Sequence, residues 1–507
     1  KTWQNMGLLD SHHISRILIN PSNADEVVVG VVGHLYSKNE ERGIFKTTNG
    51  GKTWNKTLYI DDETGIIDVV VSPKNFNVQY AASWSKDRKA WDFIGSGATS
   101  GIYKSEDAGL TWKLFTTAES GFPVGEGVGR IGLAVYDDAT VYAVLDNQFK
   151  RPLESKKSNS LPIAFSVPGD EFLKIPNKSL NSILKNYGLT EKYRAENIKH
   201  WIQNGYLQPN EAAKVVLEAI NSLAEKEVIG AEVYKSSNGG KNWTKTHPGF
   251  IDDFFYSYGY YFSVLSVDPN DVNKIYLSGV PIIKSNDGGK TFTSISEDNV
   301  HADHHVVWVN PNKSGHLING NDGGLNISYD DGAHWFKGNS HGVSQFYAVN
   351  VDEQEPYNIY GGMQDNGVWV GPSNYKFSSE WYQTGKYPYE NLIGGDGMQI
   401  QIDKRNPNIV FTGFQFGNYY RIDRANNKRD YISPVQKKGE KPFRYNWQTP
   451  ILLSSHNQEI LYMGSNFLHR SMNQGQTWTA ISPDLTQGAK EGNVAFDIYT
   501  CNYFNSN

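Results

Sequence analysis

The sequence has very little cysteine: Cys501 is the only one among 507 residues. A single thiol cannot form a disulfide within the chain, so a fold built on a disulfide framework is excluded. Long apolar runs are missing too, since no stretch reaches the roughly 18 apolar residues that a membrane-spanning helix needs. The sequence therefore predicts no membrane span.

Basic charge is also in short supply. Lys and Arg total 48 against 54 Asp and Glu, which gives a formal net charge of −6 and a pI of about 6.1. Proteins that bind nucleic acids usually carry a basic face that neutralises phosphates. The charge balance therefore argues against a nucleic-acid partner. No motif in the sequence predicts a cofactor, and we expect none.

Glycine and aromatic residues are plentiful, and many of them fall in a motif that returns six times. Its pattern is Ser/Thr-x-Asp/Asn-x-Gly-x-Thr-Trp, with small departures between copies. The copies occupy residues 47–54, 105–112, 236–243, 285–292, 328–335 and 471–478. An internal repeat of this kind indicates an architecture made of repeated structural units.

The residue types of the motif predict a hairpin turn. The Asp or Asn side chain accepts hydrogen bonds from nearby backbone N–H groups, and the Gly adopts a positive φ. The final aromatic residue is expected to pack back between neighbouring sheets. We therefore interpret the motif as a structural device rather than as a ligand-binding site.

The motif resembles the Asp-box, or BNR repeat, of sialidases, sortilin-type receptors and xyloglucanases, all of which are β-propellers. Other segments are similar to large bacterial propeller proteins described as sortilin-like or glycosyl-hydrolase-like. These segments are residues 43–46, 88–92, 301–305, 320–324, 361–367, 394–397 and 481–485. The resemblance implies a propeller fold, export to the periplasm or cell surface, and further blades on both sides of this sequence.

A second pattern accompanies the motif: a hydrophobic strand, a turn rich in Asn, Asp and Pro, and a second strand. It recurs in eight units of roughly 40 to 55 residues, the size of a four-stranded propeller blade. The first strands are predicted at residues 14–19, 66–71, 131–135, 264–267, 306–309, 346–351, 398–402 and 450–453. The predicted fold is therefore all-β, a β-propeller of about eight four-stranded Asp-box blades. The blades form one ring or belong to tandem seven-bladed propellers.

Residues 148–230 interrupt the third unit. Residues 210–226 carry apolar side chains at helical spacing, and residues 191–203 are also predicted to be helical. We predict blades 1–3 (first part) in residues 1–147, the helical insertion in 148–230, and blades 3–8 in 231–507. The insertion is either a surface loop or a lid, and the sequence leaves both open.

In a propeller, the residues just before each first strand lie on the same face as the loops that join second to third strands. The ligand-binding residues predicted on this face are His12, His13, Trp84, Trp91, Arg130, Tyr260, Tyr261, Asp303, His304, His305, Gln345, Gln364, Gln415 and Trp447. The loops add His34, Phe93, Asp146 and Asp322. Aromatic rings beside carboxylates and amides suit sugars or peptides.

The densest cluster on this face has the sequence His-Ala-Asp-His-His at residues 301–305. His301, Asp303 and His304 are an alternative set of metal ligands. However, adjacent strand residues point to opposite faces, so only one of His304 and His305 can enter the channel. We therefore favour hydrogen-bonded rim histidines over a metal site.

Two carboxylates are the candidates for catalysis. Glycoside hydrolysis needs a pair about 5 to 9.5 Å apart. Asp396, in the sequence Gly-Gly-Asp-Gly, forms a candidate pair either with Asp365, in Asp-Asn-Gly, or with Asp303. The resemblance to xyloglucanases points to Asp396, although residues 395–397 match the xyloglucanase pattern only loosely. The segment around Asp365 is equally consistent with a plain turn.

The favoured function is a binding module for a polysaccharide, glycoprotein or peptide, located in the periplasm, at the cell surface or outside the cell. One alternative is an endo-acting glycoside hydrolase that resembles xyloglucanases. Another is a scaffold subunit of a cell-envelope assembly, with envelope proteins as partners.

Overall fold

A computed structural model describes residues 2–486 except 90–91, 152–168, 187–188, 190–193, 204–206, 208–210, 212–213, 218–227, 297–298, 339–343, 377, 381–386 and 438–439. The chain forms two compact units. Unit 1 comprises Lys1–Leu153 and Lys226–His341, and unit 2 comprises Glu154–Glu225 and Gly342–Asn507. The chain therefore leaves unit 1 for unit 2, returns, and enters unit 2 a second time.

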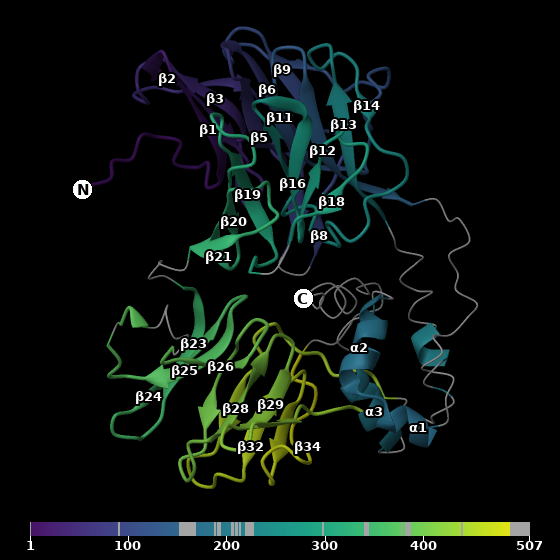
Figure 1. Ribbon diagram of the computed structural model, residues 1–507, viewed down its shortest axis with the longest axis vertical. Helices are drawn as coiled ribbons and strands as arrows, with labels where there is room; N and C mark the ends of the chain where they lie inside the picture. The colour runs from purple at the N-terminus through teal and green to yellow at the C-terminus, as the bar shows by residue number, and fades with distance from the viewer. Residues whose placement is uncertain are drawn as a thin grey trace. The chain divides into compact units, whose positions relative to one another are not determined.

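Unit 1 contains five four-stranded antiparallel sheets among its described residues (Figure 1). The first sheet consists of β1 (Ile14–Asn20), β2 (Asn23–Val31), β3 (Gly43–Thr47) and β4 (Asn55–Leu58). The second consists of β5 (Thr64–Ser72), β6 (Asn75–Ser85), β9 (Gly101–Ser105) and β10 (Lys113–Leu114). The third consists of β11 (Val128–Val135), β12 (Val141–Lys150), β13 (Val228–Ser236) and β14 (Thr244–Lys245). The fourth consists of β15 (Val264–Asp268), β16 (Asp271–Ser278), β17 (Ile282–Ser285) and β18 (Thr293–Ser294). The fifth is β19 (His304–Val309), β20 (Leu317–Asn321), β21 (Gly324–Ser328), β22 (Phe336–Gly338), and a small ribbon joins β7 (Asp87–Arg88) to β8 (Phe93–Ile94).

Unit 2 contains three such sheets in its described part, together with the helices. The sheets are β23 (Phe346–Val351), β24 (Asn358–Met363), β25 (Gly367–Pro372), β26 (Glu390–Ile393); β27 (Gln401–Ile402), β28 (Ile409–Phe414), β29 (Asn418–Asp423), β30 (Lys428–Tyr431); and β31 (Ile451–Leu453), β32 (Leu461–Gly464), β33 (Leu468–Ser471), β34 (Thr479–Ala480). The helices are α1 (Gly169–Lys174), α2 (Asn177–Asn186) and α3 (Ala195–Gln203). No helix among the described residues is long and apolar enough to cross a membrane.

The prediction of a mostly β chain built from four-stranded antiparallel sheets is confirmed. Each sheet has its strands in chain order, so the first and fourth strands form its two edges. Within unit 1 the first strands of successive sheets are neighbours: β1 contacts β5, β5 contacts β11, β11 contacts β15, and β15 contacts β19. This is the order expected of propeller blades, while closure into a ring and the blade number of each propeller stay predictions.

Hydrophobic cores lie between successive sheets of each unit. In unit 1, Tyr80 and Ile102 of the second sheet share a cluster with Leu133 and Leu145 of the third. In unit 2, Phe411 of β28 packs with buried side chains of β31 and β32. Strands in the middle of such a stack are covered on both faces, so residues 141–147 are all buried and show no alternation of polar and apolar side chains.

The repeated motif forms the same turn in all six copies, between the third and fourth strands of its sheet. The first-position hydroxyl accepts the N–H of the fifth residue, and the third-position Asp or Asn accepts the N–H of the seventh. The fifth-position glycine has φ between +82° and +89° in every copy, as at Gly109 and Gly475. The predicted turn, with its capping oxygen and positive-φ glycine, is confirmed.

The motif also ties each sheet to its surroundings. The N–H of the fourth residue donates to a carbonyl at or just after the turn between the first two strands, for example from Asp331 to Gly315 at 2.9 Å. The final tryptophan reaches back to the preceding sheet: Trp335 Nε1 donates to the carbonyl of Ile295 at 2.8 Å. The expected packing of the aromatic residue between neighbouring sheets is therefore observed.

The insertion leaves the third sheet of unit 1 between β12 and β13, which are paired as far as Lys150 and Val228. Helix α3 matches the helix expected at 191–203, whereas α1 and α2 were not predicted from the sequence. Of the helix expected at 210–226, residues 211 and 214–217 are helical, and the others lie outside the described residues. The Arg194 guanidinium lies 4.7 Å from the Phe414 ring centroid, so the insertion packs against β28.

Candidate functional site

One end of the sheets gathers the residues predicted to form a binding face. In several sheets the residue after the second strand donates to a carbonyl just before the first strand. Val32 donates to His13 at 2.8 Å, and Gln364 donates to Gln345 at 3.0 Å. Asp322 donates in the same way to Asp303 at 3.2 Å. The predicted proximity of these two kinds of loop within a sheet is therefore confirmed, and we call this end of each unit its rim.

Arg130 anchors the rim of unit 1. Its Nη1 donates to the carbonyl oxygens of Tyr260 and Tyr261, at 3.2 and 2.6 Å. Burial lowers the pKa of the Arg130 guanidinium to about 10, against the opposing attraction of Asp68. The guanidinium therefore fixes the backbone of the connection before β15, and leaves 55% of Tyr261 exposed to solvent.

His305 and Asp322 stand beside this tyrosine. His305 Nε2 lies 2.5 Å from Asp322 Oδ1, and the rings of Tyr261 and His305 meet edge to face, with centroids 5.4 Å apart. His304, the next residue along the strand, points into the sheet, where it is fully buried and bonded to Asn319 Oδ1 at 2.8 Å. Burial lowers the pKa of His304 to about 4. The two histidines thus face opposite sides, as the sequence predicts.

Asp146 is a buried carboxyl group at the same rim. Its side chain accepts a hydrogen bond from Gln148 Nε2 at 2.7 Å, and the backbones of Gly129 and Gly259 close around it. A methyl group on Gly259 would stand only 2.2 Å from the Asp146 carboxyl carbon. Burial raises the pKa of Asp146 to about 7, although Gln148 and Arg130 act in the opposite direction. Carboxyl groups with such a pKa are common at functional sites.

The remaining predicted residues of unit 1 occupy different settings. His12 and His13 are exposed, and His13 Nδ1 bonds to the carbonyl of Gly33 at 2.9 Å. Trp84 is buried, and its Nε1 donates to the carbonyl of Gly95. Its indole therefore packs inside the protein rather than on the exposed face. Trp91 lies outside the described residues. Asp303 is buried, with φ +65°.

The alternative metal ligands do not come together among the described residues. His301, Asp303 and His304 form no group whose ligand atoms converge, and His301 Nδ1 bonds to the carbonyl of Ala302. The converging group in the described part of the chain is Asp10, His12 and His34, whose ligand atoms all lie within 4.8 Å of one another. The sequence pattern did not single out Asp10, because Asp10, His12 and His34 come from two separate loops.

The rim of unit 2 brings together the other predicted residues. The N–H of Asp365 donates to Asp396 Oδ1 at 2.7 Å, and the N–H of Asp396 donates to Gln415 Oε1 at 3.1 Å. The series of hydrogen bonds continues with the N–H of Phe416, which donates to the carbonyl of Trp447 at 3.2 Å. Trp447 Nε1 in turn donates to the hydroxyl of Tyr347 at 3.1 Å. Three successive sheets thus contribute to one polar cluster.

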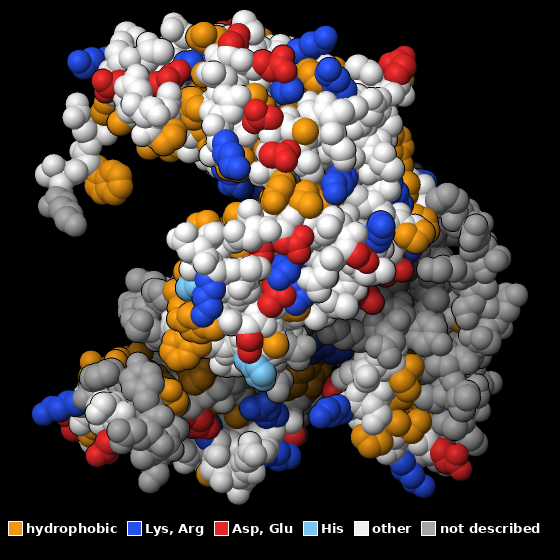
Figure 2. Space-filling model, turned by 45° about the horizontal axis from the view of Figure 1, so that its top comes forward, with side chains coloured by type: hydrophobic (Ala, Val, Ile, Leu, Met, Phe, Trp, Pro, Cys, Tyr) orange, Lys and Arg blue, Asp and Glu red, His pale blue; other side chains and the backbone are white. Residues whose placement is uncertain are grey.

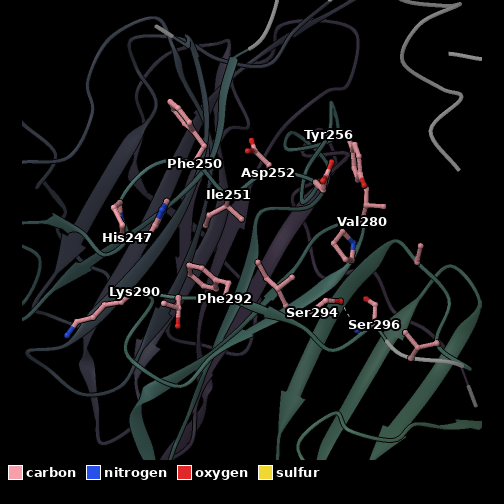
Figure 3. Close-up of a pocket in the computed structure, with 17 residues that line it drawn as sticks. His247, Phe250, Ile251, Asp252, Tyr256, Val280, Lys290, Phe292, Ser294 and Ser296 are labelled. Atoms are coloured by element: carbon pink, nitrogen blue, oxygen red, sulfur yellow. Dashed lines mark hydrogen bonds between the residues drawn. The ribbon is translucent and has the colours of Figure 1, made fainter. Parts of the chain in front are cut away.

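A pocket of about 630 Å³ in unit 1 was not predicted. Figure 3 shows Ile251, Val280 and Phe292 facing the same space, with Lys290 and Tyr256 toward opposite ends of the lining. Its walls come from the connection before β15, the loop between β16 and β17, and the segment after β18. The signal in the sequence is the length and aromatic content of residues 246–263, which include eight Phe or Tyr residues.

No protein-family model and no curated protein matches the sequence. Similar solved structures include the GH74 enzyme of Niastella koreensis, with 14% identity and a TM-score of 0.30, covering 92% of this chain and 62% of that one. The GH74 xyloglucanase of Xanthomonas campestris has 11% identity and a TM-score of 0.29, covering 94% and 65%. YCF48 bound to D1 peptide has 9% identity and a TM-score of 0.27, covering 84% and 99%.

This chain thus spans less than two thirds of the length of the two GH74 structures. The resemblance to Asp-box families stays a prediction from the sequence.

Proposed function

We propose that the chain is a binding module, acting outside the cytoplasm, whose unit 1 rim takes a polysaccharide, glycoprotein or peptide. The observation that carries this proposal is the exposed ring of Tyr261 on a backbone held by Arg130. An aromatic ring on a fixed backbone loses little conformational entropy on binding. Such a ring stacks against the apolar face of a sugar or of a side chain.

The polar groups around Tyr261 supply hydrogen-bond partners for hydroxyl or peptide groups. The His305 and Asp322 side chains lie on one side, and the Arg16–Asp68 ion pair, with its atoms 2.9 Å apart, extends the rim across β1 and β5. Acidic and basic side chains are interspersed on the face shown in Figure 2. The rim of unit 1 carries groups of both signs, Arg16 and Arg130 as well as Asp68 and Asp322, which favours a ligand without a strong charge of one sign.

The proposal is tested by binding to a panel of plant and microbial polysaccharides and glycopeptides, with the Tyr261→Ala variant beside the wild type. We expect a loss of affinity of about tenfold, the usual cost of truncating an aromatic residue at the centre of a site. Tyr329→Ala is the matched control, since Tyr329 is 61% exposed and belongs to a motif turn at the other end of its sheet. No ligand in the panel, or equal effects of the two variants, would contradict the proposal.

A second function, glycoside hydrolysis, is favoured by the contact between Asp365 and Asp396. Their adjacency puts two carboxyl-bearing residues in one cluster, together with Tyr347 and Trp447. In this hypothesis Asp396 and Asp365 are the catalytic pair of an endo-acting enzyme.

Reducing-end release from the same polysaccharides tests this second function. A hydrolase should release reducing ends with the wild type and lose release in Asp396→Asn, which keeps an acceptor oxygen for the Asp365 N–H. Equal release from both proteins would remove Asp396 from catalysis. Absence of release from every polymer would leave the binding module as the function.

A further inference from the structure

We propose that Asp10, His12 and His34 bind a divalent transition-metal ion of the zinc class. The three side chains lie at the rim of the first sheet: Asp10 and His12 precede β1, and His34 follows β2. One oxygen or nitrogen from each lies within 4.8 Å of the other two. Two imidazoles and one carboxylate are a ligand set typical of zinc. This site is separate from the residues that carry the proposed function.

The imidazole of His34 is already oriented for this role. Its Nδ1 bonds to Ser37 Oγ at 2.8 Å, which leaves Nε2 facing Asp10 Oδ1 at 3.0 Å. Histidines that ligate metals usually bond through their other ring nitrogen to a neighbouring group, which fixes the ring. Ser37 is therefore placed as such an orienting group, and the metal would replace the proton between His34 and Asp10.

The carboxylate is positioned as well. Asn39 Nδ2 donates to the backbone oxygen of Asp10 at 2.7 Å and to its Oδ2 at 3.3 Å. The same Asn39 accepts the N–H of His34 through its Oδ1 at 3.0 Å, so one buried amide links both loops of the site.

His12 supplies the third ligand. Its ring stacks on that of His34, with centroids 3.7 Å apart and planes 21° from parallel. Among the described residues, no hydrogen bond engages the imidazole nitrogens of His12. Ligand atoms around one tetrahedral zinc ion lie about 3.3 Å apart, given bond lengths near 2 Å. Because His12 is exposed, its side chain can rotate to bring a ring nitrogen toward that distance.

Hydrogen bonds from one buried side chain hold the loop that carries His34. Buried Arg42 donates to four backbone carbonyls, those of Val32, His34, Ser37 and Glu63, at 2.7 to 3.1 Å. Gly33 adopts φ +88°, and a Cβ there would stand 2.5 Å from Arg42 Cγ and Asn39 Oδ1. A metal site gains affinity when its ligands are held in place before binding. Three protein ligands also leave a fourth position for water or another ligand.

The test is metal binding by the untagged protein after dialysis against a chelator. Titration calorimetry with ZnCl₂ and elemental analysis should show one ion per chain, and Co²⁺ should give the visible absorption of a tetrahedral site. His12→Ala and His34→Ala should each weaken Zn²⁺ binding at least tenfold. His12→Ala removes an exposed side chain, so it keeps the test valid if His34→Ala does not fold.

His334→Ala is the matched control, because His334 Nδ1 lies 2.7 Å from Asp330 Oδ2 in an exposed pair that no third candidate ligand joins in the described part of the chain. We expect it to bind Zn²⁺ like the wild type. Unchanged affinity in His12→Ala, or no stoichiometric ion in the wild type, would overturn the proposal and leave an ordinary His–Asp hydrogen bond only. Loss of the ion in His334→Ala would place the metal elsewhere and would overturn it as well.

Discussion

The backbone N–H of Asp365 donates to Oδ1 of Asp396, with the two atoms 2.7 Å apart. Asp365 occupies the turn between β24 and β25 with φ +60°, and Asp396 is almost fully buried. The Asp396 carboxylate therefore holds a turn in place, whatever further chemistry it performs. Its structural role and any catalytic role have to be separated by choice of substitution.

Asp396→Ala is expected to destabilise unit 2 by about 1 to 3 kcal/mol, because it removes the acceptor of the partly buried N–H of Asp365. Asp396→Asn should cost less, since its amide oxygen can still accept this hydrogen bond. Denaturant unfolding of both variants measures the difference. Equal destabilisation by Ala and Asn would show that the negative charge, rather than the acceptor, stabilises the turn.

Asp146 should make unit 1 less stable as the pH rises. Its pKa of about 7 in the folded protein lies above the value of about 3.9 in an unfolded chain, so the folded state binds its proton more tightly. Stability from this group is fully present below pH of about 4 and is lost as the pH rises through about 7. The loss amounts to at most about 4 kcal/mol.

Asp146→Asn removes this titration. The free energy of unfolding of the variant, relative to the wild type, should therefore rise between pH 5 and pH 8, and urea unfolding at both values measures the change. Asp252→Asn is the control, because Asp252 is exposed at the surface of the same unit. A difference between variant and wild type that is flat with pH would mean that Asp146 is charged in the folded protein at pH 5.

The motif turn offers a graded test of stability. Ser285→Ala removes the hydroxyl that accepts the N–H groups of Asp287 and Gly289, at 3.3 and 2.8 Å, and should cost about 1 to 2 kcal/mol. Gly289→Ala should cost more, because φ is +89° and the new Cβ would meet Thr246 Oγ1 at 2.6 Å.

Lys290→Ala is the control for both variants, since this neighbouring side chain is exposed. Its effect should stay within about 0.5 kcal/mol. Thermal unfolding of the three variants ranks their stabilities. If Gly289→Ala were as stable as Lys290→Ala, the conformation of this turn would not contribute to the stability of the sheet.

Arg42 should control the order of the loop between β2 and β3. Arg42→Ala leaves four carbonyl groups without their donor, so we expect a loss of at least about 3 kcal/mol. Hydrogen exchange followed by mass spectrometry should show faster exchange in peptides covering residues 33–42. The exposed Arg429 provides the control variant Arg429→Ala. Unchanged exchange in Arg42→Ala would mean that other contacts hold the loop.

The sheets were predictable because their signals are local. Each motif copy contains its own capping oxygen and glycine, and the first strands, such as β23 at Phe346–Val351, coincide with apolar runs in the sequence. The ends of β12 and β13 were less predictable. Their pairing extends to Lys150 and Val228, beyond the apolar segments, because backbone hydrogen bonds continue where the side chains turn polar.

The candidate sites were predictable only in part, because they depend on contacts between distant segments. Loop positions relative to the strands were enough to collect Asp365, Asp396 and Gln415. The group of Asp10 and His34 was not found, since the path of the second loop is set by Arg42, a residue with no periodic signature. The division into two units likewise depends on packing between sheets, which no repeat in the sequence encodes.

The motif turns have a consequence for how this protein tolerates change. At one end of each sheet that carries the motif, the motif turn before the fourth strand is hydrogen-bonded to the chain at or just after the turn between the first two strands. An extra residue in the motif turn would therefore break several hydrogen bonds at once. At the opposite end, β12 and β13 stay paired as far as Lys150 and Val228, although the long insertion lies between them in the sequence. Foreign domains, affinity tags or reporter modules should therefore be grafted between β12 and β13, where the chain already carries an insertion and the strand pairing is kept.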